Sequence, residues 1–280
     1  MSHRHAQRTP VVFSHANSFG AGTYQLLFDT LRTRGVAVEA IDKFGHDPHY
    51  PVSNNWPHLV QQLVDFTVER VNRLGQPVFL VGHSLGGFLS LMAASQAPQA
   101  VRGALLLDSP VVGGWRATAL GLAKSTRLVG SVSPGKVSRK RRQHWPDEEA
   151  ALAHFATKRT FAKWHPQVLK DYIHSGTHDE LVQGQPQRVL NFTREVETAI
   201  YNTLPSNLEA QFKHQPIQCP VAFIGGTHSA EIRQVGMALT QRITQGRIMM
   251  VDGSHLFPME KPLVTAAAIE AALLNLQALS

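Results

Sequence analysis

A short run of small residues surrounds Ser84, the position in this sequence best suited to nucleophilic chemistry. The chain reads GHSLGG over residues 82–87, directly after an apolar run at 78–81 and directly before a stretch of helical character. Glycines on both sides of a serine let a strand turn sharply into a helix and leave the hydroxyl exposed at the apex. The pattern therefore predicts that Ser84 is a nucleophile. The alternative is a serine that merely caps the following helix.

A serine hydroxyl is a weak nucleophile unless a neighbouring base takes its proton, and histidine titrates in the right range for that task. Of the 15 histidines in the chain, His255 stands in a Gly-Ser-His loop after the last apolar run, at 247–251. In a parallel sheet this loop opens at the same edge as the Ser84 turn, so we expect His255 to be the base. His83 lies beside Ser84 in sequence, but the register of the strand is expected to point it away.

Short apolar runs alternate with longer amphipathic stretches over most of the chain, which predicts βαβ units around a parallel sheet. The expected strands cover residues 11–13, 36–41, 78–81, 104–107, 221–224 and 247–251. The expected helices outside the middle of the chain are 23–34, 57–74, a segment from the Ser84 turn to about residue 97, 231–243 and 262–276.

The middle of the chain breaks this alternation. No convincing β run is found from about 113 to 214, and helices are expected at 117–129, 148–163, 166–175 and 188–202. About a hundred residues of helix between two sheet strands indicate a cap. The predicted organisation is a first core segment at 1–112, a helical cap at 113–214 and a second core segment at 215–280.

Composition agrees with one large globular domain. The 280 residues are 43% hydrophobic and only 17% charged, against about 25% charged in an average soluble protein, which excludes a collagen, a coiled coil and a disordered tail. The single cysteine, Cys219, excludes an internal disulfide framework and a Cys-rich zinc site. No secretory signal and no run of 18 or more apolar residues is visible, so we expect a soluble, cytoplasmic protein.

Four features together give the chain a family resemblance: the sequence HAN at 15–17, the GHSLGG run, the predicted cap, and GSHLFPMEKP at 253–262. In these the chain resembles the α/β-hydrolase fold family, particularly its capped, esterase-like serine hydrolases, which are similar in architecture to haloalkane dehalogenases and epoxide hydrolases. The resemblance implies an α/β fold with a mostly parallel, doubly wound sheet. A serine at the apex, where those two enzyme classes use a carboxylate, argues against their chemistry here.

The resemblance also implies an oxyanion hole, made by the backbone N–H groups of Asn17 and Leu85. Family members usually carry the acid of the triad in a Gly-x-x-Asp pattern after the strand that follows the cap, but here Ser229 fills that position. Some members hold the acid at the end of the preceding strand, where this chain has Asp108. We therefore expect Asp108 to be the acid, with Glu231 in reserve. An aspartate at a strand end can instead cap a turn.

A second departure from the family lies at the start of the chain. Only about nine residues precede the first expected strand, whereas most members have a β-hairpin there. The sequence therefore predicts about six principal strands without that hairpin.

Other candidate sites carry weaker signals. Residues 139–142 read RKRR within a net charge of +7, which leaves open a nucleic-acid partner or attraction of an anionic substrate. No aromatic residues alternate with this run, and a solvated helix face or loop is the favoured interpretation. His46, Asp47 and His49 have metal-ligand chemistry, but a polar surface turn is favoured. The tryptophans and phenylalanines at 115–164 are expected mainly to pack the cap, with one or two lining an apolar pocket.

These observations predict a serine hydrolase that cleaves a small or medium, largely apolar carboxylic ester or related acyl compound through a Ser-His-Asp triad and an acyl-enzyme. We expect no cofactor, no metal, no nucleic acid and no membrane, only a small-molecule substrate, in a monomer or homodimer. Carbon–carbon bond hydrolase, lactonase, perhydrolase and acyltransferase chemistry remain alternatives on the same side chains. A non-catalytic ligand-binding protein with this fold is the alternative of another class.

Overall fold

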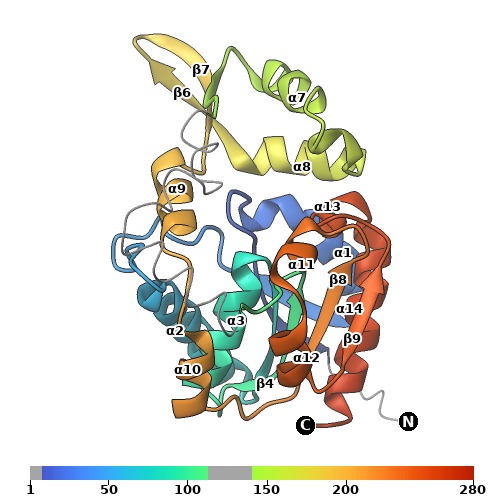
Figure 1. Cartoon of the computed structure of the whole chain (residues 1–280). Coiled ribbons are helices and arrows are strands. Elements are labelled where there is room, and N and C mark those ends of the chain that lie inside the picture. Colours follow the sequence, from blue (N-terminus) through green and yellow to red (C-terminus); the bar gives the residue numbers. More distant parts are fainter. Residues whose placement is uncertain (1–7, 113–140) are drawn as a thin grey trace, which may run out of the picture.

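A six-stranded sheet forms the centre of the computed structural model, which describes residues 8–112 and 141–280 (Figure 1). The strand order is β2-β1-β3-β4-β8-β9, and every neighbouring pair is parallel. The strands are β1 (Thr9–Ser14), β2 (Val36–Ala40), β3 (Val78–His83), β4 (Val101–Leu107), β8 (Val221–Gly226) and β9 (Ile248–Val251). The predicted mostly parallel sheet of about six strands is confirmed.

Helices cover both faces of the sheet, which explains why its inner strands are apolar on both sides. Val11 and Phe13 of β1 pack into one hydrophobic cluster with α1 (Gln25–Thr33) and α14 (Pro262–Gln277). Val12, between them, packs into the other cluster. That cluster includes residues of α2 (Pro57–Leu74), α3 (Leu85–Gln96) and α12 (Ala238–Thr244).

Most helix bounds follow the predicted signals. Helix α2 begins with Pro57 in its first turn and ends at Gly75, whose φ of +67° is the left-handed conformation that favours glycine. The single helix expected at 231–243 is instead two, α11 (Ala230–Val235) and α12, separated by Gly236 with φ +78°. Two short elements complete the core, the 3₁₀ turn η1 (Ala21–Tyr24) before α1 and α13 (Phe257–Glu260) before α14.

The residues from 113 to the start of β8, here called the insertion, are described from residue 141 onward. They form β5 (His144–Trp145), α7 (Glu148–Ala156), the 3₁₀ turn η2 (Phe161–Lys163), α8 (Pro166–Gly176), β6 (Thr177–Val182), β7 (Gln185–Leu190), α9 (Arg194–Asn202) and α10 (Leu208–His214). Helices α7 and α8 lie beyond the carboxyl ends of the strands. Helix α9 lies above α2 in the view of Figure 1, and α10 lies lower down, beside α3. The helix expected at 117–129 falls outside the described residues.

The prediction that the insertion contains only helices is wrong. Strands β5, β7 and β6 form an antiparallel sheet, and the helix expected at 188–202 begins only at Arg194. The hairpin was missed because its strands are short, largely polar and exposed, so they lack the apolar alternation that marks a half-buried strand. The sequence offered one signal, the glycine at 184. In the structure Gln183 and Gly184 both have positive φ, as a two-residue hairpin turn requires, and glycine is favoured in that conformation.

Within residues 8–112 and 141–280, no helix combines the length and the apolar character needed to cross a membrane.

The sharp turn between β3 and α3 depends on glycines. A Cβ atom on Gly82 would lie 2.1 Å from the carbonyl oxygen of Gly86, and one on Gly86 would lie 1.9 Å from the carbonyl oxygen of Ser14 in β1. The backbones of β1 and α3 are therefore in direct contact at this point. That contact sets the residues after β1 beside the first turn of α3.

We expect Gly86→Ala to lower the free energy of unfolding by about 2 kcal/mol, because the new methyl group overlaps the Ser14 carbonyl and overpacking costs about 1–3 kcal/mol. This net value takes the overlap at about 3 kcal/mol, the upper end of that range, and subtracts the roughly 1 kcal/mol that alanine gains over glycine in a helix. Urea unfolding followed by circular dichroism measures the change. Gly176→Ala, in α8, is the matched control: its Cβ would come no closer than 3.4 Å to Tyr172, and stability should not fall. Equal stability of Gly86→Ala and the parent would contradict the close contact.

Candidate active site

The residues predicted to do chemistry follow four different strands of the sheet. Ser84 comes directly after β3, Asp108 directly after β4, Asn17 three residues after β1, and His255 four residues after β9. Because these strands are parallel, all four loops open at one edge of the sheet. Ser84 has φ +53° and ψ −114°, a strained conformation that L-residues rarely adopt. The sharp turn from strand to helix imposes it.

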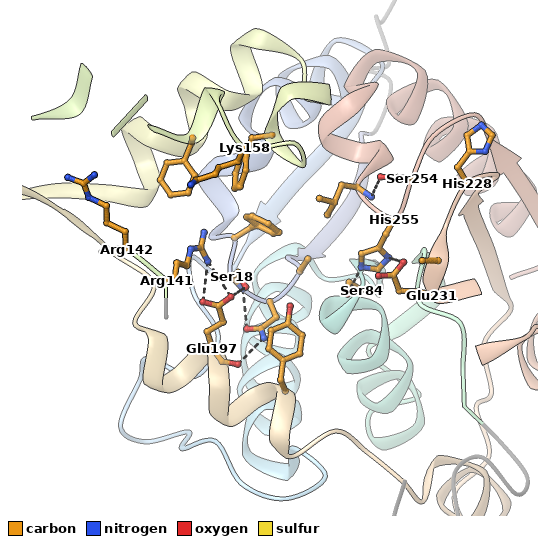
Figure 2. Close-up of a pocket in the computed structure, with 18 of the residues that line it drawn as sticks. Ser18, Ser84, Arg141, Arg142, Lys158, Glu197, His228, Glu231, Ser254 and His255 are labelled. Carbon is orange, nitrogen blue, oxygen red and sulfur yellow. Dashed lines mark hydrogen bonds and ion pairs between the residues drawn. The ribbon is translucent and has the colours of Figure 1, made fainter. Parts of the chain in front are cut away.

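Ser84 and His255 are in hydrogen-bond contact. The Nε2 atom of His255 lies 3.0 Å from Oγ of Ser84 (Figure 2). On the other side of the ring, Nδ1 lies 3.4 Å from Oδ2 of Asp108 and 3.7 Å from Oε2 of Glu231. The structure thus brings together the serine, the histidine and both carboxylates singled out from the sequence.

The two carboxylates differ in their exposure to solvent. The Asp108 side chain is 0% exposed, whereas that of Glu231 is 44% exposed and accepts a hydrogen bond from the Ser229 hydroxyl at 3.3 Å. Among the described residues, neither carboxylate oxygen of Asp108 has a hydrogen-bond partner, and Nδ1 of His255 has none either. A buried carboxylate without a donor is costly, so a small movement that lets Nδ1–H donate to Asp108 is favourable.

The loop that carries His255 is held by a neighbouring carboxylate. Glu260 in α13 accepts a hydrogen bond from the backbone N–H of Ser254 at 3.0 Å and another from its hydroxyl at 2.6 Å. The Ser254 hydroxyl oxygen in turn accepts from the N–H of Leu256 at 3.1 Å. His255 therefore sits between two anchored residues. Sequence reasoning did not single out Glu260, although it lies within the 253–262 run.

The two positions expected to form an oxyanion hole flank Ser84 in space. Leu85 is the first residue of α3, where a backbone N–H has no partner within the helix. Asn17 lines the same pocket as Ser84, and its side-chain amide donates to the carbonyl oxygen of Glu197 in α9 at 3.1 Å. The hydroxyl of Ser18 also donates to the Glu197 carboxylate. One residue of the insertion thus holds two consecutive residues of the loop after β1.

A buried chain of hydrogen bonds connects three of these loops and was missed by the sequence reasoning. The hydroxyl oxygen of Tyr24 accepts from the N–H of Ala16 at 3.0 Å and lies 2.7 Å from Nδ1 of His83. Nε2 of His83 lies 2.8 Å from the carbonyl oxygen of His255. Since a carbonyl only accepts, Nε2 of His83 carries the proton and Nδ1 accepts from Tyr24. His83 does turn away from Ser84, as expected, but it holds the backbone of His255.

Ser84 and His255 open into a pocket of about 1060 Å³ between the core and the insertion. One part of its lining is apolar and is formed by Phe19, Phe155, Phe161 and Leu256. The insertion also contributes charged side chains to it, including Arg141 and Lys158 (Figure 2). The pocket is large enough for a small or medium organic molecule.

The weaker sequence candidates lie elsewhere. Asp47 and His49 contact each other at an exposed turn, while Nε2 of His46 accepts from the N–H of Thr193 at 3.1 Å. Across the part of the chain that the structure describes, no three His, Cys, Asp or Glu side chains gather as metal ligands would. Of the basic run, residues 139 and 140 fall outside the described residues. Arg141 forms an ion pair with Glu197 at 3.1 Å.

Comparison with known proteins agrees with this fold and arrangement. A sequence model of the alpha/beta hydrolase family matches residues 11–268, nearly the whole chain. The protein therefore belongs to the α/β-hydrolase family.

Individual relatives are distant. A putative non-heme haloperoxidase of Mycobacterium phage D29 is 24% identical over 282 residues, covering 95% of this chain and 88% of the relative. A monoglyceride lipase homologue of Monkeypox virus is 29% identical over 128 residues. The match covers 44% of this chain and 46% of the relative, less than half of the relative's length. The solved structure of E-2-(acetamidomethylene)succinate hydrolase is similar in fold, with a TM-score of 0.65, 21% identity and coverage of 95% of this chain and 91% of that one.

The two buried histidines next to the site predict a pH dependence of stability. Burial lowers the pKa of His15 from 6.5 to about 4 and that of His83 from 6.5 to about 3. Below about pH 6.5 the unfolded chain binds protons that the folded protein excludes. The free energy of unfolding should therefore fall with falling pH, by about 1.4 kcal/mol per pH unit for each histidine, until the folded-state pKa values are reached.

Urea unfolding between pH 4.5 and pH 7.5 measures this slope. His83→Gln should make it shallower by about 1.4 kcal/mol per pH unit. His58→Gln, at an exposed position, should leave it unchanged. Equal slopes for His83→Gln and the parent would contradict the burial of a neutral imidazole.

Proposed function

We propose that the protein is a serine hydrolase that cleaves a small or medium, largely apolar carboxylic ester or related acyl compound. The observation that carries this proposal is the 3.0 Å contact between Oγ of Ser84 and Nε2 of His255 in the wall of a mainly apolar pocket. Family membership supports a hydrolase in general. The ester specificity rests on the chemistry of these side chains.

In the first half of the reaction, Nε2 of His255 takes the proton of the Ser84 hydroxyl while Oγ attacks the carbonyl carbon of the ester. The negative charge that develops on the carbonyl oxygen is stabilised by the N–H groups of Asn17 and Leu85. As the tetrahedral intermediate collapses, the imidazolium gives its proton to the departing alcohol, and the acyl group stays on Ser84.

In the second half, His255 takes a proton from a water molecule, whose oxygen attacks the acyl carbon. The intermediate then releases the carboxylic acid and returns the proton to Oγ of Ser84. Throughout, Asp108 holds the imidazole with Nδ1 protonated and stabilises the imidazolium. The full burial of Asp108 supports it over Glu231 in this role, since its charge there is screened least by water.

We further propose that residues 113–214 act as a cap between the core segments 1–112 and 215–280. Helix α7 contributes Phe155 to the pocket wall, and η2 contributes Phe161. Because the core supplies the reacting groups and the insertion supplies much of the remaining wall, substrate choice should depend mainly on the insertion.

A fluorophosphonate probe tests the nucleophile, since it reacts with activated serines. We expect stoichiometric labelling of the parent protein at Ser84, measured by intact-protein mass spectrometry, and no labelling of Ser84→Ala. Ser206→Ala, which removes a serine from a loop of the insertion, should label like the parent. An inert parent protein would favour the alternative of a non-catalytic ligand-binding protein.

A pair of charge-removing variants tests the acid. Asp108→Asn should lower kcat for p-nitrophenyl butyrate by about 10⁴-fold, as loss of the triad acid does in serine proteases, whereas Glu231→Gln should lower it by less than about tenfold. Circular dichroism checks that both variants fold. If only Glu231→Gln loses activity, the assignment of Asp108 is wrong.

A substrate screen distinguishes ester hydrolysis from the other reactions available to these groups. We expect hydrolysis of p-nitrophenyl esters with short or medium acyl chains to exceed hydrolysis of lactones and of vinylogous diketones. Higher activity on a diketone would instead indicate a carbon–carbon bond hydrolase. Higher turnover with added hydrogen peroxide or alcohol would indicate a perhydrolase or an acyltransferase.

A further inference from the structure

The side of the pocket formed by the insertion carries an excess of positive charge. Arg142, His154 and Lys158 all line the pocket that contains Ser84. In Figure 2, Arg142 and Lys158 lie on the insertion side, and Ser84 and His255 lie on the core side. Partial burial, Lys158 and Arg142 all lower the pKa of His154, so the two cations are near enough to act on the same imidazole.

These cations are not neutralised by the protein. Among the described residues, no Asp or Glu oxygen lies within the 4.0 Å ion-pair distance of Arg142 or Lys158. Arg141, by contrast, is paired with Glu197. The sequence before the pocket residues is strongly basic. No Asp or Glu occurs between Asp108 and Asp147, and that stretch contains Arg116, Lys124, Arg127, Lys136, Arg139, Lys140, Arg141 and Arg142.

Arg142 is also fixed in direction. Its Nε donates to the carbonyl oxygen of His144 at 2.8 Å, and its guanidinium carbon lies 5.8 Å from the centre of the Trp145 ring. One donor is thereby used, and the terminal nitrogens of the guanidinium are left to meet a ligand. A guanidinium presents its donors in a planar fork that matches a carboxylate or a phosphate.

Aromatic rings form another part of the pocket wall. The rings of Phe155 and Phe161 lie 4.8 Å apart, and the ring of Phe19 lies 6.5 Å from that of Phe161. The pocket therefore combines a reacting end at Ser84, an aromatic surface and a cationic end. A ligand that satisfies all three has a scissile acyl group, an apolar body and an anionic group.

We propose that the natural substrate carries a carboxylate or phosphate group at the end remote from the scissile bond, and that Arg142 and Lys158 bind it. The choice of scissile bond rests on the proposed hydrolase function, but the binding of the anion does not. His154 strengthens this binding where it is protonated.

Matched esters test the proposal. Mono-p-nitrophenyl adipate ends in a carboxylate, and methyl p-nitrophenyl adipate is its neutral counterpart. We expect the protein to prefer the anionic ester by about tenfold or more in kcat/KM, mostly through a lower KM. The preference should shrink as KCl rises from about 20 to about 500 mM, because salt screens partly exposed charges. p-Nitrophenyl 6-phosphonohexanoate and its dimethyl ester repeat the comparison for a phosphate-like group and distinguish the two anions.

The double variant Arg142→Gln/Lys158→Met should bring the ratio of kcat/KM for the anionic and the neutral ester close to one. Arg159→Gln is the matched control: Arg159 is exposed, next to Lys158 in sequence and not among the residues that line the pocket, so the parent ratio should persist. If the parent protein turned over the neutral ester as well as or better than the anionic one in both pairs, the anionic substrate would be overturned and the hydrolase proposal would stand.

Binding to Ser84→Ala separates this proposal from the hydrolase proposal, because the variant lacks the attacking hydroxyl. Calorimetric titration should give a Kd for mono-p-nitrophenyl adipate about tenfold lower than for the methyl ester. This result would support the anion site even if the parent protein turned over neither ester. Equal affinities in both pairs of esters would overturn it.

Discussion

The contact between the backbone of β1 and the first turn of α3 is the constraint on which the candidate site depends. Gly86 and the carbonyl of Ser14 approach so closely that no side chain fits between them. This closeness sets Ser84 and Leu85 beside the loop that carries Asn17. A pair of N–H groups from two separate elements can meet one oxygen atom only at such short range. The strained backbone of Ser84 is held by the rigid sheet around it.

The loops of the candidate site are also connected to one another by hydrogen bonds. Tyr24 in η1 and His83 at the end of β3 connect the N–H of Ala16 with the carbonyl of His255 through hydrogen bonds that are buried or partly buried. Burial keeps His83 neutral, so only one of its ring nitrogens carries a proton, and the carbonyl of His255 requires that nitrogen to be Nε2. The imidazole that faces Ser84 is therefore oriented by backbone attachment on one side and by carboxylates on the other.

The sheet, Ser84 and His255 could be placed from sequence because each depends on a local pattern: apolar runs, glycines at a sharp turn, and a loop at a strand end. The sequence could reduce the candidates for the acid to Asp108 and Glu231 but could not choose between them. That choice depends on their burial and on a difference of 0.3 Å in their distances to Nδ1 of His255. Tyr24 carried no signal, because its partner His83 lies 59 residues away and a tyrosine in a helical turn is ordinary in a core. The hairpin of the insertion has too few apolar residues for its sequence to show the alternation that predicts a strand.

The tip of that hairpin is a suitable place to attach a spectroscopic probe. This tip, at Gly184, projects away from the body of the molecule, and nearby Leu181 is 72% exposed (Figure 1). The single cysteine of the chain, Cys219, is partly buried, and burial raises its thiol pKa to about 11, so little reactive thiolate is present at neutral pH. A cysteine introduced at the tip can accept a maleimide dye selectively. Fluorescence anisotropy of that dye then follows the motion of the insertion in the otherwise native protein.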